Sequence, residues 1–338
     1  MALNDRGNVI RCAYVKFSSI VRRSFRRWGG PDIKNTKWSR GLVAVALATF
    51  VYAAQASASA PCPMDFARQI PPRSPDAMSG SEFVRSVAGI GGRERHRLIV
   101  RELLAGNLPS FLRALREVRL EEKGLGLDAR VCVMPDYLAI GSDRDYVRVP
   151  MGRSAAAAVA LRFGFLMPTR KLVDDIYAAS DVRLRPRPMT PGRLMTSVTY
   201  FREHNAFIEQ QRSGFPLGAL MAGHKKDVVL SNRLARHPER VAIYGWQRPD
   251  GRAIQPLSTV HGRDYADYSH GVRLVSDRMW IDGQSRSVYE VLADPKLAPV
   301  LTFEGRIPLA VRLLEDPARN FLAATTGTTA SSGGVGTN

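Results

Sequence analysis

Apolar residues recur at helical spacing through the first part of the chain after residue 80. Between Glu94 and Leu104, for example, Leu98, Val100, Leu103 and Leu104 follow the period of an amphipathic helix. Thr169 is a good N-cap, and Thr190 followed by Pro191 is a typical cap and first-turn pair. The predicted helices cover residues 81–87, 94–104, a segment from Pro109, 154–163, 169–179 and a segment from Thr190 through Ile208.

The last third of the chain changes to short runs typical of β-strands, bounded by turn residues. The predicted strands are 227–230, 241–246, 253–260, 272–275 and 279–281. Pro249-Asp250-Gly251 predicts a hairpin turn, because Pro presets φ and Gly accepts a positive φ. Asp282-Gly283 predicts a second turn, and 287–292 a closing helix. The expected fold class is α+β, with a helical part over 81–212 and a mostly antiparallel sheet within 220–322.

The two ends of the chain differ from this domain in composition. Residues 1–60 combine a basic region, an uncharged apolar run from Gly41 to Ala54 and A-x-A-like cleavage sites. This pattern predicts a signal peptide and a periplasmic or secreted protein, with an uncleaved membrane signal anchor as the alternative. Residues 61–80 are rich in proline and predict a linker. Residues 323–338 are mostly small and polar and predict a disordered tail.

The net charge is +18, and residues 61–338 still hold 39 basic and 29 acidic side chains. Outside the cytoplasm, this balance favours an anionic envelope polymer or polysaccharide as partner rather than nucleic acid. A solvated, arginine-rich surface that binds no partner would give the same excess of basic over acidic side chains.

Cys62 and Cys132 are the two cysteines beyond the predicted leader. In an oxidising compartment they can form one bridge, which requires Cα atoms within about 7 Å of each other. Two unrelated buried thiols are the alternative.

Three of the six histidines fall at predicted strand ends in the last third. Each of His224, His261 and His270 has a glycine beside it, which allows the backbone turns that aim a side chain into a cleft. We expect these three, with Asp227 or Asp264, to line one concave pocket at the rim of a sheet. His204 and His237 lie in or beside charged segments and are expected at the surface.

Two reaction schemes fit this set. In the first, His224, His261 and His270 bind zinc and activate a water molecule. In the second, one histidine is a general base, Asp227 assists it, and Ser269 is a candidate nucleophile. Nearby groups are expected to bind the substrate, namely Lys225, Lys226, Arg263, Tyr268 and Arg273. The alternative is non-catalytic. In that case the three histidines cluster by chance, form hydrogen bonds with the backbone and are surrounded by core aromatic residues.

Ser269-His270-Gly271-Val272-Arg273-Leu274 resembles the S-H-G-C-x-R-L signature of the L,D-transpeptidases, which cross-link peptidoglycan through a nucleophilic cysteine. That cysteine is absent here, so the resemblance does not imply transpeptidation by the same route. The use of His and Asp is also similar to that of secreted zinc D,D-peptidases. The chain as a whole resembles exported bacterial proteins of uncharacterised activity, which implies no particular reaction.

The sequence therefore favours an exported hydrolase that acts on peptidoglycan or an acidic polysaccharide. A non-catalytic protein that binds an anionic glycan is the alternative from another class. A polysaccharide lyase, with His or Tyr as base and Arg neutralising a carboxylate, is the third.

Overall fold

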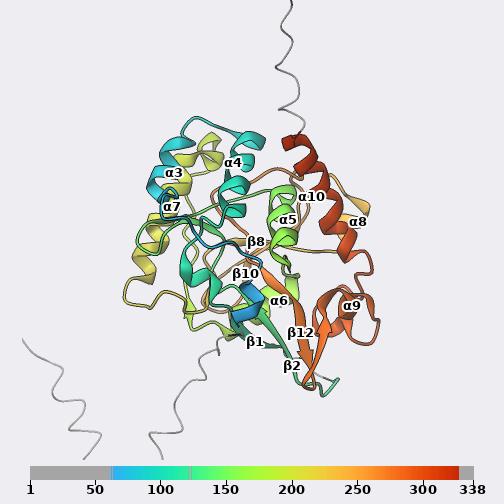
Figure 1. The fold of residues 1–338 in the computed structure, drawn as a ribbon. Helices are drawn as coiled ribbons and strands as arrows, with labels where there is room; N and C mark the ends of the chain where they lie inside the picture. The colour runs from blue at the N-terminus through green and yellow to red at the C-terminus, as the bar shows by residue number, and fades with distance from the viewer. Residues whose placement is uncertain (1–61, 63, 121, 123, 327–338) are drawn as a thin grey trace, which may run out of the picture. The chain divides into compact units, whose positions relative to one another are not determined.

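The computed structural model describes residues 62, 64–120, 122 and 124–326, all of which lie within one unit of contacts, Ala58–Asn338. The fold class is α+β, with helices leading and sheet-rich structure following (Figure 1). The helices of this part are α3 Gly80–Ser86, α4 Gly92–Leu104, α5 Arg153–Phe163, α6 Arg170–Ala179, α7 Val198–Arg212, α8 Arg233–Arg236, α9 Val288–Ala293 and α10 Ala310–Thr326. Short 3-10 turns are η1 Met64–Ala67, η2 Ser110–Arg113, η3 Arg193–Thr196 and η4 Ala298–Val300.

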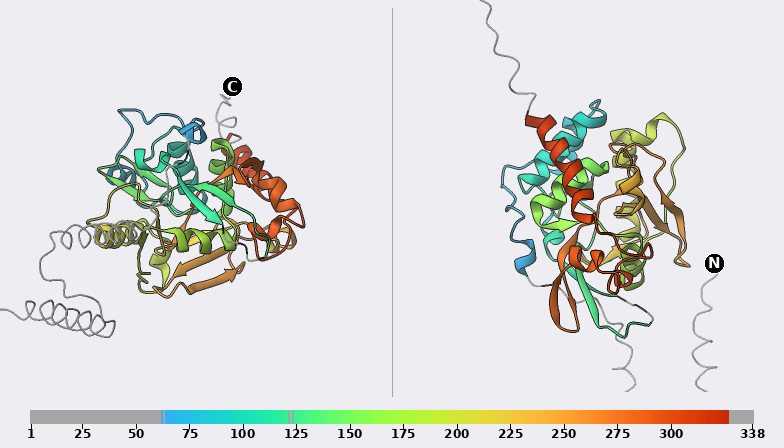
Figure 2. Two further views of the ribbon diagram at one scale, coloured as in Figure 1. Left: turned by 90° about the horizontal axis from the view of Figure 1, so that it is seen from below. Right: turned by 90° about the vertical axis from the view of Figure 1, so that its right-hand side faces the viewer.

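The larger sheet joins strands from both ends of the domain. Its strands are β1 Arg116–Leu120, β2 Ala129–Val133, β12 Val275–Ile281 and β13 Gln284–Ser287, in the order β1-β2-β12-β13, with β5 Phe165–Leu166 also pairing with β12. All of these pairs are antiparallel. The hairpins β1–β2 and β12–β13 extend together at one end of the unit (Figure 2).

The second sheet carries the chemistry-bearing residues. It has the order β10-β9-β8-β11, with β8 Lys226–Val228, β9 Ile243–Gln247, β10 Ala253–Ser258 and β11 His270–Gly271. The β8–β11 pair is parallel, whereas the other two pairs are antiparallel. Two small pairs complete the strands, namely β3 Ala139–Gly141 with β4 Tyr146–Arg148, and β6 Val182–Arg183 with β7 Met221–Ala222.

Helix α5 lies at the centre of the core, and most of its residues are buried. The run Ala155–Ala158 gives it a narrow side, which allows the backbone of another helix to approach closely. Helix α10 packs alongside it (Figure 1). The small side chains of α5 therefore allow the close packing with α10.

Several predicted elements are confirmed. Helix α4 matches the predicted segment, and the Thr169 hydroxyl caps α6 by accepting from the Leu172 backbone N–H at 3.2 Å. Strands β9 and β10 form the predicted hairpin. At the second turn Asp282 and Gly283 have φ values of 50° and 77°, which suits a tight connection between β12 and β13.

The helix predicted from Thr190 begins later, at Val198. Ser197 caps it instead, and its hydroxyl accepts from the Tyr200 backbone N–H at 3.2 Å. The prolines at 186, 188 and 191 keep the preceding segment extended, because proline disfavours the helical region for the residue before it. Leu194, predicted on the buried stripe, is exposed.

The segment predicted as a linker packs against the domain. Ile70 is buried, and the Arg113 guanidinium donates to the backbone carbonyls of Ile70 at 2.9 Å and Pro71 at 2.6 Å. Gly106 has a φ of 81° and leaves room for the Pro71 carbonyl, which a Cβ would meet at 2.2 Å. These contacts tie residues 70–71 to the loop after α4.

The bridge between Cys62 and Cys132 is formed, with Cα atoms 6.1 Å apart. This pairing is compatible with an exported protein. The predicted leader lies outside the described residues, as does most of the predicted tail, although α10 continues to Thr326. No helix in the part that the structure describes is both long and apolar enough to cross a membrane.

Candidate functional site

The parallel pairing of β8 with β11 aligns His270 with Lys226 and Gly271 with Asp227. Two of the predicted histidine segments therefore lie side by side in one sheet. Gly271 makes this possible, because a Cβ there would lie 2.5 Å from the Tyr137 ring and 2.9 Å from Cβ of Lys225.

His224 forms a buried hydrogen-bond network with two residues from the β3–β4 region, Asp136 and Arg148. Its Nε2 lies 3.0 Å from Oδ1 of Asp136, and Arg148 Nη2 donates to Oδ2 of the same carboxylate at 2.6 Å. Burial alone would raise the pKa of Asp136, but Arg148 and His224 bring it well below its usual range. Burial lowers the pKa of His224 to about 4, although Asp136 opposes this shift. Asp136 is therefore ionised and His224 neutral at pH 7.

Asp227 is buried beside an arginine and a tyrosine. It accepts a hydrogen bond from the Tyr137 hydroxyl at 2.8 Å, and burial raises its pKa to about 7. Arg273 was predicted to bind substrate, but its guanidinium is buried and donates to the backbone carbonyls of Met134 at 2.7 Å and Met221 at 2.5 Å. It therefore holds the loop before β3 and strand β7 together.

Lys225 is buried next to three histidine-bearing segments. Its Nζ donates to the Tyr268 carbonyl at 2.6 Å, and no carboxylate forms an ion pair with it within the described part of the chain. Burial, together with the charge of Arg148, lowers its pKa to about 7. The amine is therefore partly neutral near physiological pH, which is the state required of a general base.

His261 and His270 approach each other, with ring centroids 6.4 Å apart. His261 is half-buried and stacks on Tyr265 at 4.1 Å, whereas His270 is fully buried. Burial lowers the pKa of His270 to about 4. Ser269 does not contact either imidazole through a hydrogen bond, because its hydroxyl donates to Asp267 at 2.5 Å. The predicted role of Ser269 as nucleophile therefore lacks a histidine base in this conformation.

His204 was expected at the surface, but it is fully buried on the inner face of α7. Its ring lies 5.0 Å from Tyr268 and 6.5 Å from Trp246. Burial lowers its pKa, and the charge of Lys225 acts in the same direction. The sequence did indicate that His204 is buried, because Phe201, His204 and Ile208 share helical spacing and so lie on one face of the helix.

We name the side chains of His204, Lys225, Trp246, Tyr268 and His270 the Lys225 cluster. Several buried polar atoms in or beside it have no hydrogen-bond partner among the described residues: His224 Nδ1, Trp246 Nε1, and His270 Nδ1 and Nε2. Trp246 also has a φ of 60°, which is rare for a bulky residue. Unpaired buried polar atoms and backbone outliers both gather at functional sites.

A proline-rich segment covers one side of this cluster. We name residues 185–196 the strap. The Met189 backbone N–H donates to the Tyr268 hydroxyl at 2.8 Å, and the Met195 carbonyl accepts from the Tyr268 backbone N–H at 2.9 Å. The side chains of Met189 and Met195 pack against Phe201, Trp246 and Tyr268. The strap therefore covers Tyr268 and Trp246.

The described residues do not fit the predicted zinc site. Within this part of the chain no group of three or more His, Cys, Asp or Glu side chains is arranged to hold a metal ion. His224 turns its Nε2 to Asp136, whereas His261 stacks on Tyr265. Asp264, the alternative acidic ligand, pairs with Arg93 at 3.1 Å.

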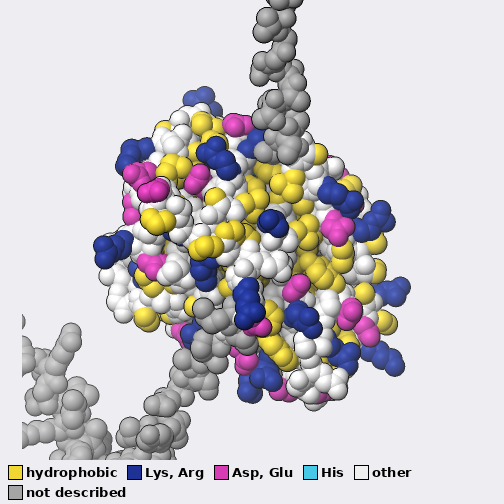
Figure 3. Space-filling model, viewed as in Figure 1, with side chains coloured by type: hydrophobic (Ala, Val, Ile, Leu, Met, Phe, Trp, Pro, Cys, Tyr) yellow, Lys and Arg dark blue, Asp and Glu magenta, His cyan; other side chains and the backbone are white. Residues whose placement is uncertain are grey.

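The remaining predicted substrate-binding residues are spread around the site. Lys226 lies over the Trp246 ring at 5.0 Å, and Arg263 is half-buried in the loop after β10. Lys and Arg side chains are distributed over the face in Figure 3, with Asp and Glu among them. Sequence reasoning did not single out Asp136 or Arg148, because they lie about 75 to 90 positions before His224 and only the fold brings them to it.

Comparison of the chain with protein families, with curated proteins and with solved structures finds no match.

Proposed function

We propose that the protein is an exported hydrolase of an envelope or extracellular polymer, and that Lys225 is its general base. The observation that carries this proposal is the burial of an amine with a pKa of about 7 near His270, whose two ring nitrogens lack partners among the described residues. Strongly shifted groups that gather in one place are typical of catalytic sites. The hydrogen-bonded residues Asp136, His224 and Arg148 lie near Lys225 and hold that part of the site in position.

The chemistry assigned to Lys225 is a proton shuttle. The neutral amine accepts a proton from a water molecule, and the water oxygen attacks the electrophilic carbon of the scissile bond. The resulting ammonium returns the proton to the leaving group, so that the bond is hydrolysed and the amine regenerated. Imidazole N–H groups of His204 and His270 would donate to the developing negative charge.

Access to this site requires the strap to move away from Tyr268. Only two hydrogen bonds join its backbone to Tyr268, and most of its residues are exposed. Active-site lids of this kind open on the microsecond to millisecond timescale in many enzymes.

The test compares the full chain with its Lys225→Met variant on two substrates, purified peptidoglycan and polygalacturonate, by the release of soluble fragments. We expect hydrolysis of one substrate and a loss of about 100-fold or more in the variant. His237→Gln is the control, because His237 is exposed. No release by the wild-type protein from either substrate would contradict the proposal, as would full activity of Lys225→Met.

A stability measurement separates catalysis from a structural role. Since the folded-state pKa of Lys225 is lowered from 10.5 to about 7, the buried amine costs stability wherever the unfolded lysine is charged, and most below pH 7. Met fills similar volume without a charge, so the variant should be at least as stable as the wild type at pH 6. Urea unfolding at that pH measures the difference. An inactive variant that is also strongly destabilised would indicate a structural lysine.

A further inference from the structure

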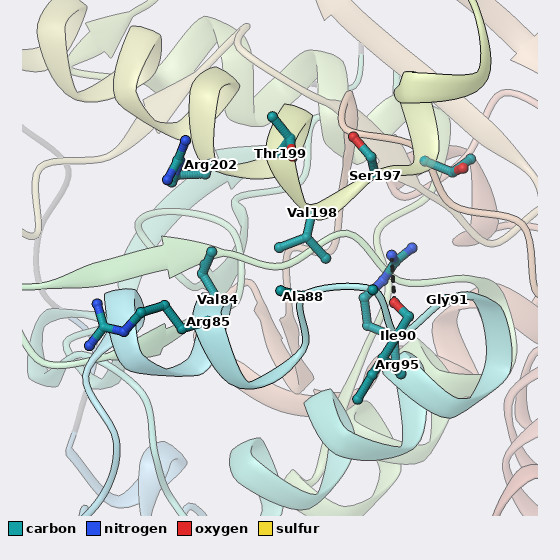
Figure 4. Close-up of a pocket in the computed structure, with 12 residues that line it drawn as sticks. Val84, Arg85, Ala88, Ile90, Gly91, Arg95, Ser197, Val198, Thr199 and Arg202 are labelled. Atoms are coloured by element: carbon teal, nitrogen blue, oxygen red, sulfur yellow. Dashed lines mark hydrogen bonds between the residues drawn. The ribbon is translucent and has the colours of Figure 1, made fainter.

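A second site lies outside the Lys225 cluster, in a cleft between α3, α4 and the start of α7. It encloses a volume of about 400 Å³. The cleft is drawn in Figure 4, where Val84, Ala88 and Val198 form its middle. Arg95 and Ser197 lie on one side of these apolar groups, whereas Arg85 and Arg202 lie on the other.

Arg95 is a buried cation without a counter-ion. Only 4% of its surface is exposed, and it forms no ion pair with any described acidic residue. Its Nη1 donates to the Ile90 carbonyl at 3.2 Å, its guanidinium lies over the Phe201 ring at 4.6 Å, and its buried Nε has no partner. An unpaired buried charge is costly, and an anion bound in the cleft would remove that cost.

Two helices begin at the same cleft. The N-cap Gly91 of α4 and residues 197–199 at the start of α7 line it. The first N–H groups of a helix have no partner within the helix, and the helix dipole adds positive potential there. The first turn of α7 contains no acidic residue, and Glu94 in α4 pairs with Arg97 at 2.9 Å. The acidic residues of these two helices therefore do not neutralise the positive potential at the cleft, which remains available to attract an anionic ligand.

The opposite side of the cleft leads into a second hollow of about 300 Å³. The two hollows share Val84, Arg85 and Arg202. Both arginines are exposed, and neither forms an ion pair with another described residue. Positive groups therefore stand at two places along the joined hollows, which we call the groove, with apolar side chains between them. Asp145 also lines the second hollow, and its carboxylate accepts hydrogen bonds from the backbone N–H and the hydroxyl of Ser81 at 3.0 and 3.1 Å.

We propose that this groove binds an acidic oligosaccharide, with one carboxylate at Arg95 and the α4 and α7 N-termini and another at Arg85 and Arg202. Regularly spaced carboxylates match the two positive ends, and the C–H faces of sugar rings match the apolar middle. A ligand longer than one sugar unit also accounts for the second hollow. The proposal does not depend on hydrolysis at Lys225.

The test measures the binding of fluorescent hexagalacturonate to the full chain by anisotropy, with maltohexaose as the uncharged competitor. We expect saturable binding that weakens as salt is raised and that maltohexaose does not compete away. The double variant Arg85→Gln, Arg202→Gln should weaken binding about tenfold, equivalent to about 1.4 kcal/mol. Both residues are exposed, so this variant keeps the fold, and Arg95→Met should weaken binding further.

Arg101→Gln is the matched control, because Arg101 is an exposed arginine of α4 that does not line the groove. It should bind hexagalacturonate within about twofold of the wild type. An equal loss in this control and in the double variant would show charge attraction without a site and would overturn the proposal. Unchanged binding by the double variant would overturn it as well. Lys225→Met should bind normally, which separates this proposal from the hydrolase.

Discussion

The buried histidines show how strongly burial alone can set the charge of a side chain. His96, His224 and His270 differ in their neighbours, yet desolvation is the main cause of the lowered pKa in each, and the pKa is about 4 for all three. Each is therefore neutral in the folded protein at pH 5 to 6, where the unfolded chain would protonate it. His96 is not part of the Lys225 cluster, so its pKa shows that burial lowers the pKa of a histidine without any catalytic role.

We expect the free energy of unfolding to fall as the pH is lowered from about 6.5 to about 4. A histidine with a lowered folded-state pKa binds its proton more weakly than in the unfolded chain, so acid favours unfolding in that window. Asp227, Asp174 and Asp277 act in the opposite direction, because their pKa values are raised. We expect the four buried histidines with lowered pKa values to outweigh them. Urea unfolding at several pH values measures the slope.

His96→Gln should reduce this slope, whatever its effect on absolute stability, and the exposed His237→Gln should not. A wild-type free energy of unfolding that stays constant from pH 6.5 to 4 would contradict the assignment of neutral buried histidines.

At the scale of elements, the strap is an irregular, largely exposed segment that Tyr268 and Gln211 join to the rest of the fold. It carries three prolines and a 3-10 turn, and most of its side chains are exposed. Tyr268 joins it to the β-rich part through the hydroxyl and the backbone N–H. Local opening is expected where few buried contacts hold a segment.

Tyr268→Phe should make the strap open more often. The variant removes the acceptor for the Met189 N–H and keeps the ring, and one such hydrogen bond contributes about 1 kcal/mol. Trypsin cleavage after Arg193 should become about five times faster, because protease attack on a segment in rapid exchange follows the population of its open form. The two Arg-Pro bonds of the strap resist trypsin.

Tyr200→Phe is the control, since the Tyr200 ring contacts Tyr268 at 5.7 Å but its hydroxyl forms no hydrogen bond with another described residue. Equal cleavage rates at Arg193 in the wild type and Tyr268→Phe would show that this hydrogen bond does not hold the strap.

At the scale of the whole molecule, the disulfide joins the start of the described chain to the centre of the larger sheet. Cys132 lies in β2, and its bridge to Cys62 spans a sequence separation of 70 residues. The Cys62 N–H also donates to the Leu115 carbonyl at 2.8 Å. A cross-link of this loop length restricts the unfolded chain strongly.

Replacing Cys62 with serine should lower the free energy of unfolding by about 2 to 4 kcal/mol. Urea unfolding measures the change, and mass spectrometry of the wild type should find two protons fewer than in the reduced form, with a mature N-terminus near Pro61. Cys12→Ser is the control and should leave both measurements unchanged. An identical unfolding midpoint before and after reduction of the wild type would contradict a stabilising bridge.

Local rules recovered much of the secondary structure because they act between neighbours in sequence. The Thr169 cap and the Pro249-Asp250-Gly251 turn are complete within a few residues, and both elements formed as predicted. The start of α7 was placed too early because two caps, Thr190 and Ser197, satisfy the same local rule. Packing of Met189 and Met195 on Tyr268 accompanies the use of the second cap.

The sequence by itself determined the α+β class and the hairpins, which depend on local spacing. It limited the two cysteines beyond the predicted leader to one possible pairing, and the structure showed that the bridge is formed. Only the tertiary structure decided which polar groups meet. It joined Asp136 to His224, buried Lys225 without a carboxylate, and placed Arg95 beside the start of a helix about 100 residues away. Charge state and ligand access depend on burial and on neighbours that are distant in sequence. The spacing of residues along the chain does not reveal which of them become neighbours.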